Sequence, residues 1–225
     1  MELPPEVLLA IDIPRVVIER LPVYARTLSL LAADGIDVVS SQELGTRLGV
    51  TPAQIRKDLS YFGRFGKQGR GYQVGPLLDQ LQQILGLDRR WTMALVGVGQ
   101  LGRAILAYGG FKPQGFDIVA AFDADNRLIG SEVSGVRIYN VKDLRRQIAS
   151  SPVHIGIVAV PAHEAQEVID ALIGGGIRAI LNYAPVVARV PRHLRDEVQV
   201  QNIDPVLALQ GMTYYLKDGL DGSAK

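Results

Sequence analysis

Three glycines, spaced two and three residues apart, stand between an apolar run and a helical pattern. The stretch "LVGVGQLGRAI" has the form G-x-G-x-x-G. After a strand, the first glycine permits a tight turn, the second lets a pyrophosphate approach the backbone, and the third allows close helix–strand packing. The free N–H groups at the helix N-terminus then bind the anion. The motif predicts a dinucleotide site at Gly97, Val98, Gly99, Gln100, Leu101 and Gly102.

An acidic residue follows at the distance that such a site requires. Asp123 ends the apolar run "FDIVAAFD", about 20 residues after Gly102. A carboxylate at a strand end accepts hydrogen bonds from ribose hydroxyls and repels a 2′-phosphate. Asp123 therefore favours NAD over NADP.

A cluster of cations precedes this motif. Residues 47–72 hold six lysines and arginines against one acid, Asp58, whereas the whole chain has a formal charge of +1. No global field attracts a polyanion, so any nucleic-acid site must be a local patch. The six cations are Arg47, Arg56, Lys57, Arg64, Lys67 and Arg70.

The basic cluster lies on a pair of short helical patterns. "SSQELGTRL" and "TPAQIRKDLSYF" each begin with a capping-box pair, Ser40 with Glu43 and Thr51 with Gln54. A three-residue turn containing Gly49 joins them, as in a helix-turn-helix.

The second helix of this motif enters the major groove, where its early residues meet base edges. We therefore predict that Gln54, Arg56 and Lys57 contact DNA, while Ile55 and Leu59 face the core. A glycine-rich hairpin, "GRFGKQGRGY", follows, with Lys67 and Arg70 beside its tip. It is typical of a wing that approaches a phosphate backbone or a narrow A/T-rich minor groove. The alternative is a solvated basic face on a small helical domain.

The remainder follows an α/β rhythm. Apolar strand patterns such as "WTMALV" and "VHIGIVAV" alternate with helical ones, which predicts a parallel sheet covered on both faces. The fold class is therefore α/β: a winged helix-turn-helix domain at residues 1–78, a Rossmann-like doubly wound sheet at 79–203, and a closing helix and tail at 204–225.

The closing helix is amphipathic. "PVLALQGMTYYLK" places Val206, Leu209, Met212 and Leu216 along one face. The pattern is compatible with burial against a partner subunit or against the chain's own sheet.

Composition excludes several classes. The 225 residues include no cysteine, so disulfides and thiolate metal sites are absent, and the three histidines are scattered. We predict no metal site. The N-terminus lacks the features of a signal peptide, and the apolar runs are too short to span a bilayer. We therefore predict a cytoplasmic protein that is not embedded in a membrane.

No catalytic set stands out, since there is no Y-x-x-x-K pair and His163 begins a helical pattern. We therefore expect that the protein is not an enzyme. The alternatives are an NAD-dependent oxidoreductase with an accessory helical domain, a CoA- or NADP-binding protein, and a DNA-binding scaffold whose nucleotide is structural.

The motifs together resemble one family. "QIRKDLSYFG", "LVGVGQLGRAI", "FDAD", "VPAHEAQ", "ILNYAPV" and "NIDPVLALQGMTYYL" occur in the order seen in the Rex family of redox-sensing transcriptional repressors, from about residue 15 to 217. The resemblance implies a homodimer whose C-terminal helices are exchanged between subunits. It also implies NADH and NAD as ligands, with NADH releasing the protein from double-stranded operator DNA, an inverted repeat rich in A/T.

The resemblance also implies residue roles. Arg56, Lys57, Ser60 and Tyr61 would contact the operator, with Gly69 at the wing tip. Arg26, Tyr108 and Asp204 would form a conformational switch. The nicotinamide half of the cofactor would lie near Tyr108, Pro161 and Tyr183, and Asn182 and Asp204 would also bind the cofactor.

Overall fold

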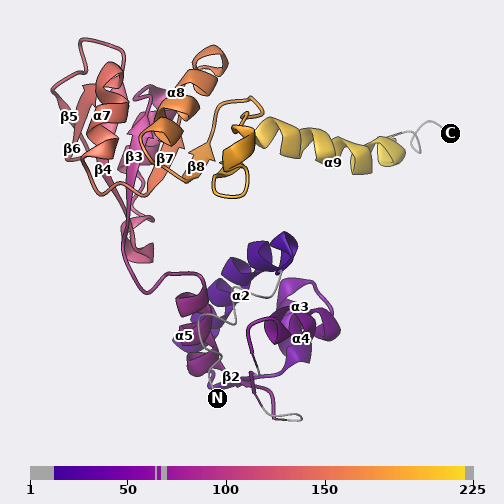
Figure 1. Cartoon of the computed structure of the whole chain (residues 1–225). Coiled ribbons are helices and arrows are strands. Elements are labelled where there is room, and N and C mark those ends of the chain that lie inside the picture. The colour runs from indigo at the N-terminus through magenta and orange to yellow at the C-terminus, as the bar shows by residue number, and fades with distance from the viewer. Residues whose placement is uncertain (1–12, 64, 67–69, 221–225) are drawn as a thin grey trace. The chain divides into compact units, whose positions relative to one another are not determined.

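The computed structural model describes residues 13–63, 65–66 and 70–220, and the chain divides into two compact units, Met1–Arg89 and Arg90–Lys225 (Figure 1). The division lies later than the boundary expected after residue 78. Residue 78 falls inside helix α5 (Val74–Ile84), which packs against α2 (Arg15–Ala33) and buries Leu77 and Leu81 in the core of the first unit. The whole of α5 therefore belongs to the N-terminal unit.

The first unit is helical with one small sheet. Its first described helix, α2 (Arg15–Ala33), buries one apolar stripe formed by Val17, Leu21, Tyr24, Leu28 and Leu31. Strand β1 pairs antiparallel with β2, which places Val39 opposite Tyr72. Its remaining elements are α2 (Arg15–Ala33), β1 (Val38–Val39), α3 (Ser41–Leu48), α4 (Pro52–Ser60) and β2 (Tyr72–Gln73).

Both helices of the helix-turn-helix have the predicted N-cap bond, in which the Ser or Thr side chain accepts from a backbone N–H, but not the return bond of a full capping box. Ser40 Oγ accepts from the Glu43 N–H at 3.0 Å, and Thr51 Oγ1 accepts from the Gln54 N–H at 3.1 Å. The reciprocal bonds of a capping box are replaced. Glu43 pairs with Arg47 at 3.3 Å, and the Gln54 NH2 group donates to Asp58 of its own helix.

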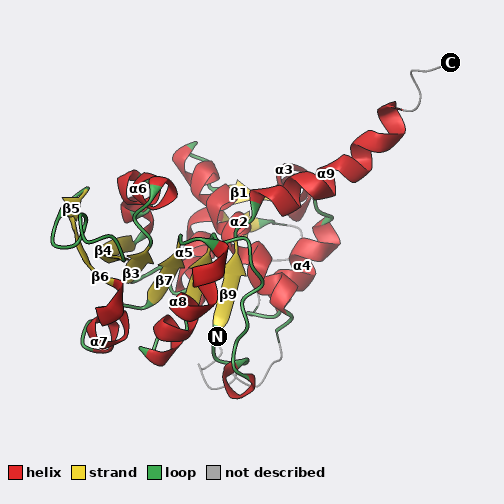
Figure 2. Cartoon of the chain, turned by 90° about the horizontal axis from the view of Figure 1, so that it is seen from above, coloured by secondary structure: helices red, strands yellow, loops and turns green. Residues whose placement is uncertain are grey.

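The second unit is a seven-stranded sheet in the order β5-β6-β4-β3-β7-β8-β9, parallel except that β5 is antiparallel to β6. Successive residues of β3 enter opposite cores: Met93 and Leu95 pack on the α6 side, Ala94 and Val96 on the side of α7 and α8. Figure 2 shows α6 on one face and α7 and α8 on the other, so the expected coverage of both faces is confirmed. The strands are β3 (Trp91–Val96), β4 (Phe116–Asp123), β5 (Glu132–Val133), β6 (Val136–Asn140), β7 (Ile155–Val158), β8 (Ala179–Asn182) and β9 (Gln199–Asn202).

The last helix of this unit lies outside its core. The final helix presents apolar side chains to solvent, among them Leu209, Met212 and Tyr215. None of the three lies in a core cluster of the described chain. The helices are α6 (Gln100–Ala107), η1 (Lys112–Gln114), η2 (Val141–Asp143), α7 (Leu144–Ala149), α8 (Ala162–Gly174), η3 (Arg192–Leu194) and α9 (Pro205–Leu220). Across the described residues, none of the helices combines the length and the apolarity needed to span a bilayer.

Candidate functional site

Helix α4 presents a basic face. Arg56, Lys57 and Ser60 are exposed, while Ile55 and Leu59 are buried as expected. The Arg56 guanidinium donates to Ser41 Oγ of α3 at 3.0 Å, and the Ser60 hydroxyl donates to the Lys57 carbonyl at 2.7 Å. The neighbouring helix therefore steadies Arg56, and the Lys57 ammonium stays exposed beside it.

The C-terminal end of this face continues toward the wing. Tyr61 is half-buried at the C-cap of α4, and Arg70 is exposed in the turn before β2. The wing residues Lys67 and Gly69 lie outside the described residues. The structure thus places six of the eight predicted DNA contacts in the first unit: Gln54, Arg56, Lys57, Ser60, Tyr61 and Arg70.

A buried carboxylate under this face was missed from the sequence. Asp58 has 0% of its surface exposed and accepts from Arg20 at 2.6 and 2.8 Å, from the Tyr24 hydroxyl at 2.7 Å, and from Gln54 Nε2 at 2.6 Å. The available signal was its position, three residues after Ile55 on the buried stripe of the helix. We name Arg20, Tyr24, Gln54 and Asp58 the Asp58 network.

The network keeps Asp58 charged. Burial alone would raise the pKa of Asp58, but hydrogen bonds from Arg20, Tyr24 and Gln54 outweigh it and hold the pKa below its usual value. Burial and the bond to Asp58 raise the pKa of Tyr24 above its usual range. The ion pair with Asp58 likewise raises the pKa of Arg20. At neutral pH the network therefore contains one carboxylate, one guanidinium and one neutral phenol.

The glycine loop of the second unit joins β3 to α6 as the motif requires. Gly97 has φ of 95°, in the left-handed region that favours glycine, and a Cβ there would overlap the Ala159 carbonyl. A Cβ on Gly102 would overlap the carbonyl oxygen of Gly97. The first glycine makes the turn and the third lets α6 approach the loop.

Gly99 differs from both. A Cβ at Gly99 would meet nothing within 4 Å, and its φ of −71° suits any residue. No steric reason within the protein thus requires a glycine at the N-cap of α6. The space before the helix N-terminus is what the approach of a pyrophosphate needs. Gln100 and Leu101 are exposed beside it, and Val98 is buried.

Asp123 ends β4 next to this loop. Its carboxylate accepts from the Val98 N–H at 2.6 Å and from the Asp125 N–H at 2.8 Å. Each oxygen has remaining acceptor capacity, so a ribose hydroxyl could still donate to it. The nearby Asp125 is bound by Arg127, whose hydrogen bonds lower the pKa of Asp125 to about 2. The guanidinium occupies Asp125, whereas Asp123 faces the loop.

Two of the residues predicted near the nicotinamide, Pro161 and Tyr183, follow neighbouring strands of the sheet, whereas Tyr108 follows helix α6. Tyr108 caps the C-terminus of α6 and is 62% exposed, its ring T-shaped to Phe111 at 4.9 Å. Pro161 is the N-cap of α8 after β7, and Tyr183 follows β8. Because β3, β7 and β8 are adjacent and parallel, their carboxyl ends share one edge, where ligands of open α/β sheets bind.

Asn182 requires a correction. Its side chain is fully buried, donates to the carbonyls of Ala184 and Val186 and to Asn202, and accepts from the Ala184 N–H. Both donors and the carbonyl are engaged by protein, so the predicted cofactor contact does not agree with this structure. Asn182 instead holds the loop that carries Tyr183.

The predicted switch residues are divided between the units. Arg26 is exposed on α2 of the first unit. Asp204 begins α9 in the second unit, where it accepts from the Val206 N–H at 2.9 Å and so acts as a helix cap. Tyr108 belongs to the same unit as Asp204.

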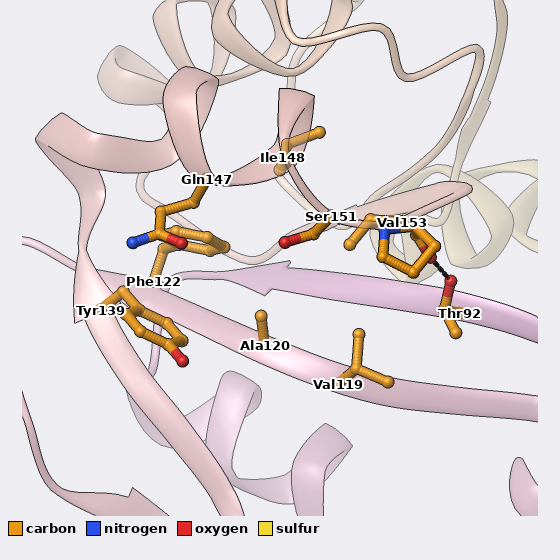
Figure 3. Close-up of a pocket in the computed structure, with 10 residues that line it drawn as sticks. Thr92, Val119, Ala120, Phe122, Tyr139, Gln147, Ile148, Ser151 and Val153 are labelled. Atoms are coloured by element: carbon orange, nitrogen blue, oxygen red, sulfur yellow. Dashed lines mark hydrogen bonds between the residues drawn. The ribbon is translucent and has the colours of Figure 1, made fainter.

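A separate hollow of about 260 Å³ lies elsewhere on the sheet (Figure 3). Its lining includes Thr92 at the start of β3, Phe122, Tyr139 and the side chains of Gln147 and Ser151. It contains none of the predicted site residues. Among the residues that the structure describes, no three histidines or acids gather as a metal site would require.

The two units define a class: a helix-turn-helix with a basic second helix, joined to a Rossmann-like sheet with a dinucleotide loop, is the architecture of a nucleotide-responsive DNA-binding regulator. Family models agree with this division. Residues 12–60 match the family described as "Putative DNA-binding protein N-terminus", and residues 88–186 match the "CoA binding domain" family.

Comparison with whole proteins gives the family itself. The redox-sensing transcriptional repressor Rex of Chloroflexus aurantiacus is 54% identical over 203 residues, covering 90% of this chain and 94% of that protein. The crystal structure of RSP, a Rex-family repressor, with β-NAD+ and operator DNA has a TM-score of 0.86 at 36% identity, covering 96% of this chain and all of that one. RSP with β-NADH gives a TM-score of 0.82 at 35% identity, with 96% and 100% covered. The chain belongs to the Rex family of redox-sensing transcriptional repressors.

Proposed function

We infer that this chain is a DNA-binding transcriptional repressor that senses the ratio of NADH to NAD and leaves its operator when NADH binds. The observation that carries this inference is that one chain contains both the basic helix α4, suited to the major groove, and an open dinucleotide loop at Gly97–Gly102. The family and the RSP complexes with operator DNA, β-NAD+ and β-NADH support it.

The nucleotide we propose is NADH or NAD, although the matched domain family is named for CoA. A phosphorylated ribose suits this loop poorly, because the Asp123 carboxylate lies one hydrogen bond from Val98 and repels a further phosphate. The pyrophosphate would lie at Gly97–Gly102, and the nicotinamide near Tyr108, Pro161 and Tyr183.

For DNA, we propose that Arg56, Lys57, Ser60 and Tyr61 contact an operator built as an A/T-rich inverted repeat. The wing, with Lys67, Gly69 and Arg70, would add contacts to the phosphate backbone or minor groove. Such an operator needs two reading helices at fixed spacing. The repressor would meet its operator in the cytoplasm, as the sequence predicts.

A homodimer would supply the two helices. The exposed apolar face of α9 supports exchange of this helix between two copies, since Leu209 and Met212 are exposed in the single chain and a partner copy would cover them. Asp204, at the start of α9, would then stand with Arg26 and Tyr108 in the switch that the family resemblance implies.

Release by NADH rather than NAD follows from the nicotinamide. The adenosine and pyrophosphate are the same in both forms, so the glycine loop and Asp123 cannot distinguish them. The oxidised ring is a cation, and burying it among mostly apolar groups costs more than burying the neutral reduced ring. The reduced form therefore enters more deeply and favours the released dimer, by the difference in its affinity for the two states.

One titration tests this function. Fluorescence anisotropy of labelled operator duplex is measured at fixed salt and constant total nucleotide, while the fraction of NADH is varied. We expect release to follow the NADH fraction. Equal release by NADH and NAD would refute redox sensing, and indifference to both would leave a DNA-binding scaffold with a structural nucleotide.

The competing function is an NAD-dependent oxidoreductase. We propose that the chain is not an enzyme, since neither His163, exposed at the start of α8, nor any other histidine forms part of an apparent proton-transfer set. Incubation with NADH and a panel of aldehydes and 2-oxo acids should show no oxidation of the cofactor. Turnover of any of them would favour the enzyme.

A further inference from the structure

The carboxylate of Asp58 has all its acceptor positions occupied. Oδ1 accepts from Arg20 Nη2 at 2.8 Å and from Gln54 Nε2 at 2.6 Å, and Oδ2 accepts from Arg20 Nε at 2.6 Å and from Tyr24 Oη at 2.7 Å. An ionised carboxylate has about four such positions. Three of the four donors come from α2, so α2 holds both oxygens of Asp58 in place.

This arrangement decides which way the Gln54 amide points. An ionised carboxylate can only accept, so the NH2 group, and not the carbonyl, must face Asp58. The lowered pKa of Asp58 keeps it in that form at neutral pH. Within the part of the chain that the structure describes, Asp58 is the only hydrogen-bond partner of the Gln54 side chain. The carbonyl Oε1 and the second amide hydrogen remain available.

We propose that Asp58 is a positioning residue that orients Gln54 to recognise an adenine. In the major groove, Oε1 accepts from the adenine N6 amino group and the remaining Nε2 hydrogen donates to N7. The inference rests on the proposed function, because it requires α4 to lie in that groove. Gln54 contacts the base, while Arg20 and Tyr24 act only through Asp58.

The fixed orientation is what gives the selectivity. A freely turning glutamine amide can present its NH2 group toward the O6 acceptor of guanine. With the NH2 group committed to Asp58, guanine O6 would face Oε1, and two acceptors would be left without a proton between them. The buried network thus turns an ambiguous side chain into one that discriminates adenine from guanine.

The first experiment selects preferred duplexes from a randomised double-stranded DNA library with the full-length chain. Affinity is then measured by anisotropy for all four base pairs at each position of the selected site. We expect one position in each half-site to prefer adenine over guanine by about tenfold or more, and Gln54→Ala to reduce that preference to near one. Gln80→Ala, an exposed glutamine on α5, should leave every position unchanged.

Two further variants separate positioning from folding. Asp58→Asn leaves Gln54 in place, but an asparagine amide can present either a donor or an acceptor, so the adenine preference at the same position should fall. Affinity for an unrelated duplex at low salt should not change. Tyr24→Phe removes the donor to Oδ2 without changing a buried charge, which frees an acceptor position on the Asp58 carboxylate, so the Gln54 amide is held less firmly and the adenine preference at that position should fall.

The outcomes are distinct. Failure of the parent to select any sequence would overturn the proposed function. If the parent selects a site and Gln54→Ala keeps the same preference at every position, Gln54 does not recognise a base. If Gln54→Ala flattens one position while cooperatively folded Asp58→Asn keeps the adenine preference there, Asp58 does not position it. If Asp58→Asn does not fold, Tyr24→Phe decides, and an unchanged adenine preference in that variant would show that the Asp58 network does not position Gln54.

Discussion

The two units of this chain place their functional groups by different means. In the first unit, side chains on α4 face solvent while the Asp58 network holds the helix against α2 through groups far apart in sequence. In the second unit, the loop at Gly97–Gly102 offers backbone, and its geometry depends on side chains being absent. The proposed DNA-binding surface depends on the side chains that α4 presents, whereas the dinucleotide loop depends on glycines that have no side chain.

The difference teaches where each unit is sensitive to substitution. Truncating a side chain should damage the first unit, because it removes a contact or leaves a buried group without its partner. Adding a side chain should damage the second, because it fills space that a ligand or a neighbouring carbonyl needs. The following predictions test this contrast, from the largest expected effect to the smallest.

Gly99→Val should strongly weaken NADH binding while the unit stays folded. The Cβ meets nothing within the protein but stands where a pyrophosphate would approach. Loss of two charge-assisted hydrogen bonds to the loop would lower affinity about a hundredfold or more. Isothermal titration with NADH measures this, with Gly75→Val, at another open glycine, as the control. Full NADH affinity in Gly99→Val would place the pyrophosphate elsewhere.

Asp58→Asn should destabilise the first unit by about 3 kcal/mol at pH 7, because it breaks a buried ion pair. The folded-state pKa of Asp58 is lowered, so its stabilising effect is present above its unfolded pKa of about 3.9 and is lost as pH falls through the folded value. The difference in stability between parent and variant should therefore shrink in acid.

Urea unfolding followed by circular dichroism at several pH values checks the Asp58 prediction. Asp79→Asn, at an exposed acid on α5, serves as the control and should change little. A difference between parent and Asp58→Asn that stays constant into acid would mean that Asp58 is not ionised in the folded state.

Arg56→Ala and Lys57→Ala should each weaken operator binding by about 1–3 kcal/mol if the residue contacts a base edge. Arg70→Ala and Lys67→Ala should instead weaken binding evenly across sequences and reduce the salt slope by about 1 each. Anisotropy with operator and unrelated duplexes at several salt concentrations separates the two. Lys142→Ala, on the second unit, is the charge-matched control. Parent-like binding of both duplexes by Arg56→Ala would show that α4 does not read the operator.

Asp123→Ala should weaken NADH by about tenfold, through loss of its hydrogen bonds to ribose, and should relax discrimination against NADPH. The effect is smaller because the backbone of the loop remains, although Val98 loses its acceptor. Parallel titrations with NADH and NADPH measure it. Asp125→Ala is the comparison, and a larger change there would make Asp125 the ribose partner.

Much of both units could be predicted from the sequence because local rules govern it. The caps at Ser40 and Thr51, the left-handed turn at Gly49 and the strand–loop–helix around Gly97 depend on neighbours a few residues away. The parallel sheet also followed from its apolar runs. The end of the first unit was expected after residue 78, inside α5, because the sequence does not show that α5 packs against α2.

Two side chains show why the remainder could not be predicted. Asn182 follows an apolar strand pattern and was expected to contact a ligand, yet bonds to Ala184, Val186 and Asn202 consume its amide. Asp58 was counted only as an acid among cations. Neither pattern shows which distant group will lie within hydrogen-bond reach.

Neighbouring residues thus decided the local structure of the chain. They set where helices begin, where glycines make turns, and which helix carries the basic side chains. Tertiary structure decided burial and partnership. It brought Arg20 and Tyr24 to Asp58 across more than thirty residues, and it left Leu209 and Met212 of α9 exposed in a single chain. Local patterns set a residue's own conformation, but the cost of burying a charge or exposing an apolar face depends on what the rest of the fold brings beside it.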